Sequence, residues 1–292
     1  MKKSLIEEAT KRLQQLEQAG VKPRDAQSEE PRLEVNGRAS PARAREERVS
    51  AANVRVIDLA RLQAAGFITP NVKESQLLHE FRIIKRPLIQ NALGKGAAPI
   101  ANGNLVMITS SLPGEGKSFV AVNLAMSMAM EVDCRVLLVD ADVVRPSIPR
   151  LLGIQPAKGL MDVLTTPDLG LAEVLLKTNI PRLDLLLAGT HHASASEFLA
   201  SGAMNELLQG VATRYADRLV VFDSPPLLAT TESRVLAAHM GQVVMVVEAD
   251  KTTRGVLESA LATVESCPVV MTLLNKVSRS ETASYYGYGY GR

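Results

Sequence analysis

The sequence predicts an α/β fold in which helices cover both faces of a mainly parallel sheet. Short apolar runs alternate with helical patterns along the chain, and several of these runs end at an aspartate or a glycine. Apolar strands separated by helices are typical of parallel sheets that are buried on both faces. The chain has 292 residues, of which 46% are apolar, and this is enough for one such domain with extensions at its ends.

The expected elements follow one another in a regular order. We predict strands over residues 105–110, 135–139, 183–187, 219–222, 243–247 and 269–274. Helices are predicted over residues 4–19, 56–65, 74–93, 118–129, 196–215 and 254–265, with a kink at Pro87. Ligands bind at the carboxyl ends of the strands in sheets of this kind, so residues that follow a strand are the first candidates for a site.

Four segments of the chain differ in composition. Residues 1–19 are expected to form an amphipathic helix, which either docks on a partner or a membrane surface or packs on its own domain. Residues 20–70 are rich in charged and small residues, and we expect a largely disordered linker with a short helix. The folded domain is expected over residues 71–280, and residues 281–292 are expected to be a flexible tail.

A glycine-bearing loop joins the first strand of the domain to the helix that follows. Residues 111–118 read Ser-Leu-Pro-Gly-Glu-Gly-Lys-Ser, the phosphate-binding P-loop pattern with its first glycine replaced by serine. Gly114 and Gly116 let the backbone turn its N–H groups inward around a phosphate. Lys117 is placed to reach the β- and γ-phosphates, and the Ser118 hydroxyl to bind Mg²⁺. The residues expected to bind the nucleotide are Pro113, Gly114, Glu115, Gly116, Lys117, Ser118 and Phe119.

Aspartates follow two other predicted strands. Asp140 and Asp142 end one of them, and Asp223 ends another. A single aspartate after a strand is often a turn residue or a helix cap. Because the P-loop and both aspartate motifs fall at the carboxyl ends of strands, we expect them to meet in one magnesium–nucleotide site. The expected ligands of Mg²⁺ are Ser118, Asp140 and Asp223.

Three positions bear on the identity of the nucleotide. Asn275 begins the run Asn-Lys-Val-Ser, which lacks the aspartate with which GTPases read guanine, and the Asp-Ser-Pro-Pro run at Asp223 lacks the GTPase glycine. We therefore expect ATP, with Asn275 near it. Partition- and cell-division-type ATPases resemble the chain in their sheet, but they carry a signature lysine where this chain has Leu112. An ATPase switch of that type, without kinase chemistry, is the alternative function.

Four of the five tyrosines lie in the last eight residues, among glycines. They are Tyr285, Tyr286, Tyr288 and Tyr290. Nothing in the spacing of this segment predicts a helix or strand that would bury the rings. Such a tail either associates with itself as a low-complexity segment or, beside a magnesium–ATP site, presents phenols as acceptors for phosphoryl transfer.

Taken together, these motifs resemble those of the bacterial P-loop protein-tyrosine autokinases (BY-kinases) of exopolysaccharide and capsule biosynthesis systems. The chain looks most like the free-standing cytoplasmic form found at exosortase-associated (PEP-CTERM) polysaccharide loci. The resemblance implies that Lys117, Asp140 and Asp142 are catalytic, with Asp140 activating the tyrosine hydroxyl or holding Mg²⁺. Two positions depart from the family pattern, because Val144 and Ile83 stand where family members carry arginines of the aspartate motif and of the ring-forming helix.

The resemblance also implies partners and a location. Copies of the chain are expected to associate and to phosphorylate one another in trans, and the added negative charge would then release the tail. A separate membrane protein, a chain-length determinant or polysaccharide co-polymerase, is expected to activate the kinase. The start of the chain has no apolar core typical of a signal peptide, and the two cysteines have no paired spacing. We expect a cytoplasmic protein at the inner face of the membrane, and the net charge of +2 does not favour nucleic acid.

Overall fold

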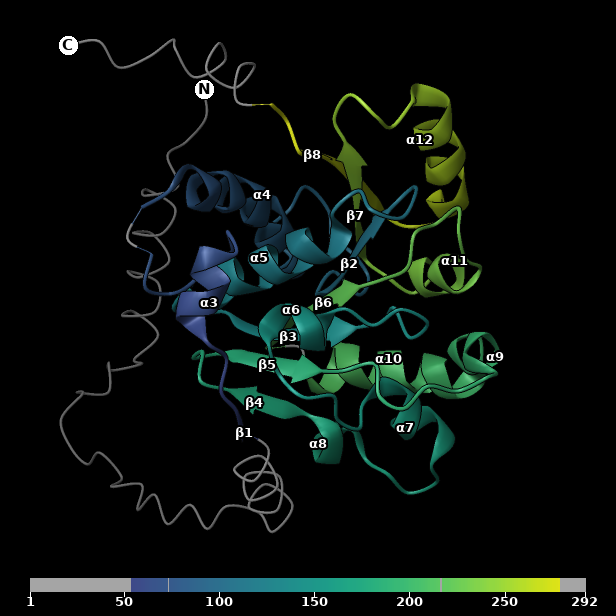
Figure 1. Cartoon of the computed structure of the whole chain (residues 1–292). Coiled ribbons are helices and arrows are strands. Elements are labelled where there is room, and N and C mark those ends of the chain that lie inside the picture. The colour runs from purple at the N-terminus through teal and green to yellow at the C-terminus, as the bar shows by residue number, and fades with distance from the viewer. Residues whose placement is uncertain (1–53, 73, 216, 279–292) are drawn as a thin grey trace, which may run out of the picture. The chain divides into compact units, whose positions relative to one another are not determined.

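An eight-stranded sheet organises the part of the chain that the structure describes, residues 54–72, 74–215 and 217–278 of a computed structural model (Figure 1). The strands are β1 (Val54–Arg55), β2 (Leu105–Ser110), β3 (Arg135–Asp140), β4 (Leu176–Thr178), β5 (Leu183–Leu186), β6 (Arg218–Asp223), β7 (Gln242–Glu248) and β8 (Val269–Asn275). Their order is β1-β4-β5-β3-β6-β2-β7-β8. Neighbouring strands are parallel except β4 and β5, which are antiparallel. The predicted α/β fold with a mainly parallel sheet is confirmed.

Helices lie on both faces of this sheet. They are α3 (Leu59–Ala64), α4 (Gln76–Ala92), α5 (Lys117–Ala129), α6 (Ile148–Leu152), α7 (Leu160–Thr165), α8 (Leu171–Val174), α9 (Ala195–Leu199), α10 (Gly202–Arg214), α11 (Glu232–Ala237) and α12 (Arg254–Leu261), which continues as a 3₁₀ turn, η1 (Ala262–Val264). Figure 1 shows α4 and α5 on one side of the sheet and α10 and α12 on the other.

Alternation along the central strands builds the two cores. In β2, Val106 and Ile108 pack into the core beneath α4 and α5, whereas Leu105 and Met107 pack into the core beneath α10 and α12. Successive side chains of a strand point to opposite faces, so an uninterrupted apolar run fills both layers. All six residues of β2 are buried, which places the P-loop that follows it at the centre of the sheet.

The structure differs from the sequence-based expectation over residues 54–70, which were expected to belong to a linker. β1 pairs with β4, and Ile57, Leu62 and Phe67 are buried in the core beneath α4 and α5. The expected helix over 56–65 begins only at Leu59, because the Asp58 side chain caps it by accepting a hydrogen bond from the backbone N–H of Arg61. A strand of two residues leaves too short a pattern to be recognised in a sequence.

Three further differences concern single elements. The predicted helix over 196–215 is split into α9 and α10, because the Ser201 hydroxyl accepts from the N–H of Met204 and starts a new helix. The strand β4 was not predicted, since its three residues are too few to show a period. The helix α4 continues without interruption through Pro87, where a kink was expected.

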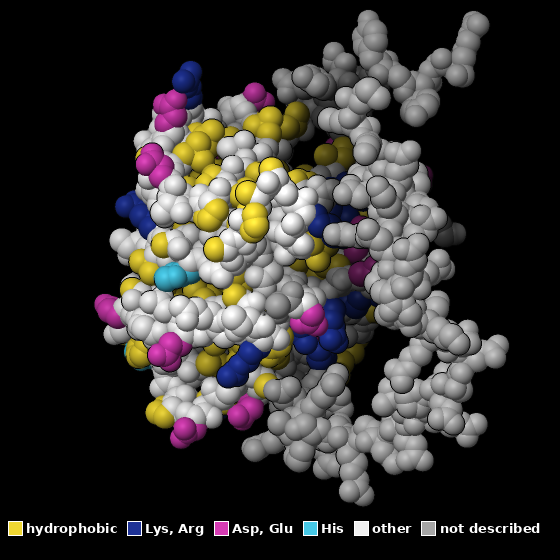
Figure 2. All heavy atoms as spheres, turned by 180° about the vertical axis from the view of Figure 1, so that it is seen from behind, with side chains coloured by type: hydrophobic (Ala, Val, Ile, Leu, Met, Phe, Trp, Pro, Cys, Tyr) yellow, Lys and Arg dark blue, Asp and Glu magenta, His cyan; other side chains and the backbone are white. Residues whose placement is uncertain are grey.

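The surface carries both signs of charge. Figure 2 shows acidic and basic side chains interspersed with apolar atoms over one face of the molecule. No helix within the described residues is long and apolar enough to cross a membrane. The predicted N-terminal helix and the tyrosine-rich tail both lie outside the described residues.

Candidate nucleotide and phosphoryl-transfer site

The P-loop connects the end of β2 to the start of α5 through two glycines in the left-handed region. Gly114 has φ of 91° and Gly116, the N-cap of α5, has φ of 99°. Residues with a Cβ rarely adopt such angles. A Cβ on Gly116 would also lie only 2.1 Å from the side-chain nitrogen of Asn275, so a larger residue there would displace Asn275 from the loop.

Side chains from the neighbouring strands fix the outer side of this loop. Asn275 donates a hydrogen bond to the backbone oxygen of Glu115 (2.9 Å), and Lys276 donates to that of Gly114 (2.8 Å). The buried Glu115 carboxylate accepts from the N–H of Leu112 (2.7 Å) and from the hydroxyl of Thr252. Asn275 and Glu115 were predicted to bind the nucleotide, and in the structure their side chains brace the loop.

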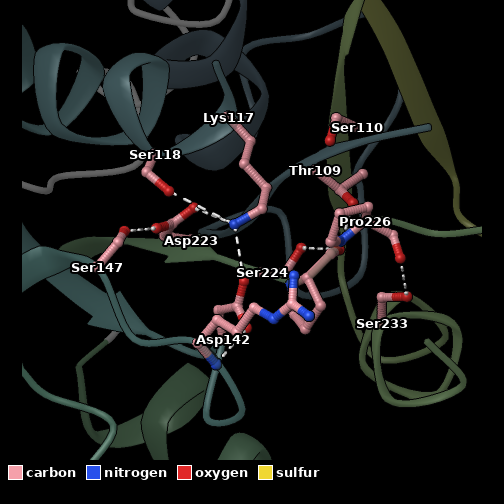
Figure 3. Close-up of polar contacts among 12 residues, drawn as sticks. Thr109, Ser110, Lys117, Ser118, Asp142, Ser147, Asp223, Ser224, Pro226 and Ser233 are labelled. Atoms are coloured by element: carbon pink, nitrogen blue, oxygen red, sulfur yellow. Dashed lines mark hydrogen bonds and ion pairs between the residues drawn. The ribbon is translucent and has the colours of Figure 1, made fainter. Parts of the chain in front are cut away.

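Lys117, the first residue of α5, points into a group of carboxylates (Figure 3). Its Nζ lies 2.9 Å from Asp142 Oδ2 and 3.6 Å from Asp223 Oδ1. Burial alone would lower the pKa of Lys117, but the negative charges of Asp223 and Asp142 outweigh it and raise this pKa above its ordinary value. The ammonium group is therefore firmly charged and is held where the phosphates of a nucleotide would approach the loop.

Asp140 and Asp223 are directly paired in the registers of β3 and β6, and both are fully buried. Burial, followed by the charge of Asp223, raises the pKa of Asp140 to about 7. Burial also raises the pKa of Asp223, although Lys117 and the Ser118 hydroxyl oppose this shift. Two carboxylates side by side at the base of a phosphate site are costly to ionise together unless a cation joins them.

Each of these carboxylates has one oxygen in use and one without a hydrogen-bond partner. Asp140 Oδ2 accepts from the backbone N–H groups of Ser147 (3.1 Å) and Ile148 (3.0 Å), and Asp223 Oδ2 accepts from the Ser147 hydroxyl (3.3 Å). Within the described part of the chain, Asp140 Oδ1 and Asp223 Oδ1 are buried and have no hydrogen-bond partner. Among these residues Asp140 Oδ1 has no partner, and Asp223 Oδ1 has only the ion pair with Lys117 at 3.6 Å. Such oxygens fit a hard cation such as Mg²⁺, which binds one or two carboxylates together with water and phosphate oxygens.

The structure brings five of the predicted site residues together and leaves others apart. Lys117, Ser118, Asp140, Asp142 and Asp223 form one cluster. The ring of Phe119 instead packs 5.0 Å from the ring of Phe67, and Pro113 is exposed. The four predicted acceptor tyrosines lie outside the described residues.

Sequence reasoning missed two contributors to the site. Ser147 contacts both Asp140 and Asp223, and Thr252 holds Glu115 of the P-loop from the loop after β7. Neither residue belongs to a recognised motif. The only available signal for Ser147 was its position shortly after the aspartate motif, in the segment that must turn back over the strand end.

Comparison with known proteins assigns the chain to a family. Residues 102–265 match the ParA family model, described as the NUBPL iron-transfer P-loop NTPase. The chain is 33% identical over 187 residues to the tyrosine-protein kinase YwqD of Bacillus subtilis, and this match covers 62% of the chain and 77% of that protein. It is 32% identical over 192 residues to the tyrosine-protein kinase wzc of Salmonella typhimurium, covering 65% of the chain. The chain spans about a quarter of the length of wzc and of other curated relatives.

Solved structures agree with this assignment. The crystal structure of the VpsO kinase domain has a TM-score of 0.58 at 28% identity, covering 69% of this chain and 96% of that one. The kinase domain of the Escherichia coli tyrosine kinase ETK shares the fold at 23% identity, with a TM-score of 0.56 and coverage of 79% and 97%. The resemblance inferred from the motifs is confirmed: the chain belongs to the ParA family of P-loop NTPases and, within it, to the bacterial tyrosine-protein kinases.

Proposed function

We propose that this protein is an ATP-dependent protein-tyrosine autokinase, which transfers the γ-phosphate to tyrosines in the tail of a neighbouring copy. The observation that carries the proposal is the cluster at the P-loop, where Lys117 is ion-paired with Asp142 and Asp223. Beside this lysine, the buried Oδ1 atoms of Asp140 and Asp223 accept no hydrogen bond from the described residues. A purely structural cluster would satisfy these atoms. The tyrosine-protein kinases among the relatives supply the reaction class.

The charged Lys117 ammonium explains how the site would bind the phosphates of a nucleotide. In the structure the Lys117 ammonium is shared between Asp142 and Asp223. A triphosphate entering the loop exchanges one anionic partner of Lys117 for another, so the lysine keeps a compensated charge in both states. The inward N–H groups of the loop and the start of α5 add donors for the same phosphate oxygens. Positioning and charge neutralisation supply most of the catalysis in phosphoryl transfer.

Metal and proton roles divide between the two buried aspartates. We assign Mg²⁺ to the Ser118 hydroxyl and Asp223, and when bound the ion neutralises charge on the phosphates. Asp140 Oδ1 takes the phenol proton as the tyrosine oxygen bonds to the γ-phosphorus and the bond to the ADP oxygen breaks. A pKa of about 7 makes Asp140 a stronger base than an ordinary carboxylate, which suits a phenol with a pKa of ~10.

The acceptors and partners belong to the same proposal. Tyr285, Tyr286, Tyr288 and Tyr290 are the proposed acceptors. Each phosphate adds about −1.5 to −2 charges, so successive transfers weaken the attraction of the tail to an acidic site. We propose that this cycle of association and release regulates exopolysaccharide polymerisation or export. A membrane chain-length-determinant protein is the proposed activator.

The first experiment is mass spectrometry of the C-terminal peptide after incubation with Mg²⁺ and ATP. We expect phosphotyrosine in the wild type and none in Lys117→Met. Lys251→Met is the matched control, because Lys251 is 72% exposed and, among the described residues, its ammonium group pairs with the Glu248 carboxylate. It should label like the wild type. Circular dichroism establishes that all three proteins are folded.

A truncation tests the acceptor assignment separately. Removal of residues 285–292 should abolish tyrosine labelling and leave ATP affinity unchanged. Labelling that persists at tyrosine in the truncated protein would refute the tail as acceptor. Bound and hydrolysed ATP without any phosphotyrosine, even with a candidate activator peptide, would instead favour a partition-type ATPase switch.

A further inference from the structure

Residues 54–72 precede the segment that matches the ParA model, yet they pack against its catalytic half. Ile57 is fixed at both backbone polar groups by the Asn179 side chain, whose oxygen accepts from the Ile57 N–H (2.8 Å) and whose nitrogen donates to the Ile57 oxygen (3.0 Å). Leu62 and Ile68 are buried beneath α4 and α5. This strap, residues 54–72, is therefore held firmly to the sheet and carries α3 in a fixed place.

The Arg61 side chain on α3 extends to the carboxyl end of α6. Arg61 Nη2 donates to the backbone oxygen of Arg150 (3.2 Å). The guanidinium also lies over Gly153, the left-handed C-cap of α6, where an added Cβ would sit 2.0 Å from Arg61 Nη1. The last carbonyls of a helix have no partner within the helix, and a positive charge there is favourable. Arg61 thus anchors one end of α6.

The opposite end of the same helix holds Asp140. The N–H groups of Ser147 and Ile148 bind Asp140 Oδ2, which leaves Oδ1 buried and without a hydrogen-bond partner. α6 has only five residues, and helices this short have little stability of their own. Its position is therefore set by the packing of Ile148 and Leu152 in the core and by what binds its two ends. The position of its N–H groups in turn orients the Asp140 carboxylate.

We propose that Arg61 is a positioning residue for Asp140, acting through α6; the effect on catalysis rests on the autokinase function proposed above. Without Arg61, α6 keeps its core packing and its N–H groups on Asp140 but loses the anchor at its carboxyl end. We expect these N–H groups, and with them the Asp140 carboxylate, to be held less firmly in the position that presents Oδ1 to the site. The Arg61 guanidinium donates its hydrogen bond to Arg150 on α6, not to the P-loop or to Lys117. The proposal therefore predicts a loss in turnover without a loss in ATP binding.

Kinetics of the full-length chain test the catalytic part. Arg61→Gln should lower kcat for tail phosphorylation by about ten-fold or more, since small displacements of a reacting group are costly, with KM for ATP within two-fold of wild type. Arg61→Lys keeps a cation at the end of α6 and should recover part of the loss. Arg254→Gln, which removes an arginine that is 91% exposed and paired with Glu258, should match the wild type. Wild-type kcat in Arg61→Gln would overturn the proposal.

Hydrogen exchange tests the structural part without requiring kinase activity. In Arg61→Gln, the peptide that spans residues 140–152 should exchange its amides faster than in wild type, because Ser147 and Ile148 lose protection, while peptides of α5 and α10 keep their rates. Unchanged exchange in residues 140–152 would refute the coupling from Arg61 to Asp140. If the wild type proves inactive toward tyrosine, the autokinase function fails and exchange alone decides the positioning role.

Discussion

The buried carboxylate of Asp162 and the buried pair Asp140 and Asp223 have pKa values that shift in opposite directions. Asp162 accepts hydrogen bonds from the N–H of Gly159 (2.8 Å) and from both the N–H (3.0 Å) and hydroxyl (2.7 Å) of Thr190. Burial raises the pKa of Asp162, but these hydrogen bonds outweigh it, and the pKa is lowered overall. At Asp140 and Asp223, by contrast, burial prevails and the pKa is raised. Asp162 is 7% exposed, whereas Asp140 and Asp223 are fully buried, so the difference lies both in the depth of burial and in the hydrogen-bond partners.

The contrast distinguishes a carboxylate that stabilises the fold, Asp162, from two that are arranged for a ligand, Asp140 and Asp223. Saturated with donors, Asp162 ties the start of α7 to the segment after β5 and stabilises the fold. The Asp140 and Asp223 carboxylates each keep one oxygen without a hydrogen-bond partner and remain close to a like charge, an arrangement that costs folding free energy. Such a cost is expected where the missing partner is a ligand, here the proposed Mg²⁺–ATP.

The largest expected effect is that of Asp223→Asn on activity. Loss of this carboxylate should reduce tyrosine phosphorylation by at least about 100-fold, the scale on which removal of one electrostatic contributor slows an enzyme. The free energy of unfolding should stay equal to that of wild type or rise, because a desolvated charge is removed while Lys117 keeps its closer partner, Asp142. Denaturant titration without Mg²⁺ measures the second quantity. A marked loss of stability would assign Asp223 a structural role instead.

The reverse outcome is expected for Asp162→Asn. The amide cannot accept all three hydrogen bonds as a charged group, and the free energy of unfolding should fall by about 1–3 kcal/mol. Activity per folded molecule should stay within about two-fold of wild type, since Asp162 lies outside the Lys117 cluster. Urea denaturation and initial rates measured at one protein concentration check both values. Strong inactivation without destabilisation would contradict the comparison.

Lowering the pH should change the contributions of Asp162 and Asp140 to the free energy of unfolding in opposite directions. The folded-state pKa of Asp162 lies below its unfolded value, so its contribution is present above pH ~4 and is lost as the pH falls through the folded pKa. The folded-state pKa of Asp140 is about 7, so between pH ~4 and 7 the folded state binds the proton more tightly and stability falls as the pH rises.

Unfolding of single variants across pH 3–8 in EDTA checks these signs. The stability gained by Asp140→Asn over wild type should grow from pH 4 to pH 7 and then level off. The stability lost in Asp162→Asn should be constant above pH ~5 and shrink at lower pH. Parallel pH curves for the two variants would show that the comparison of their environments is wrong.

The smallest effect is expected for an exposed ion pair. Arg254 and Glu258 are four residues apart on α12, 2.7 Å from each other, and the arginine is 91% exposed. Solvent screens such pairs, so Arg254→Gln should change the free energy of unfolding by less than about 0.5 kcal/mol. Thermal unfolding at low and high salt measures this baseline. A larger, salt-dependent change would mean that exposed charges also contribute to this fold.

The sequence by itself determined the fold and the polar cluster. Apolar runs ending at Asp140 and Asp223, and the glycines and lysine of the P-loop, have a local pattern, and parallel strands necessarily bring their carboxyl ends to one edge of the sheet. Those residues were predicted to meet because the rule that joins them depends on strand ends alone. The predicted boundary of the domain at residue 71 was wrong, because residues 54–70 pack on the sheet, whereas the N-terminal helix and the acceptor tyrosines stay predictions.

Only the tertiary structure decided which atoms of the cluster are satisfied and what holds them. Asp140 uses one oxygen to bind α6, and Arg61 anchors the far end of that helix. Asn275 and Glu115 brace the P-loop. These contacts join residues that are mostly distant in sequence. Contacts of this kind produce no periodic pattern and no fixed motif spacing in the sequence. They depend on where each helix packs on the sheet, and tertiary packing, not local sequence, determines that position.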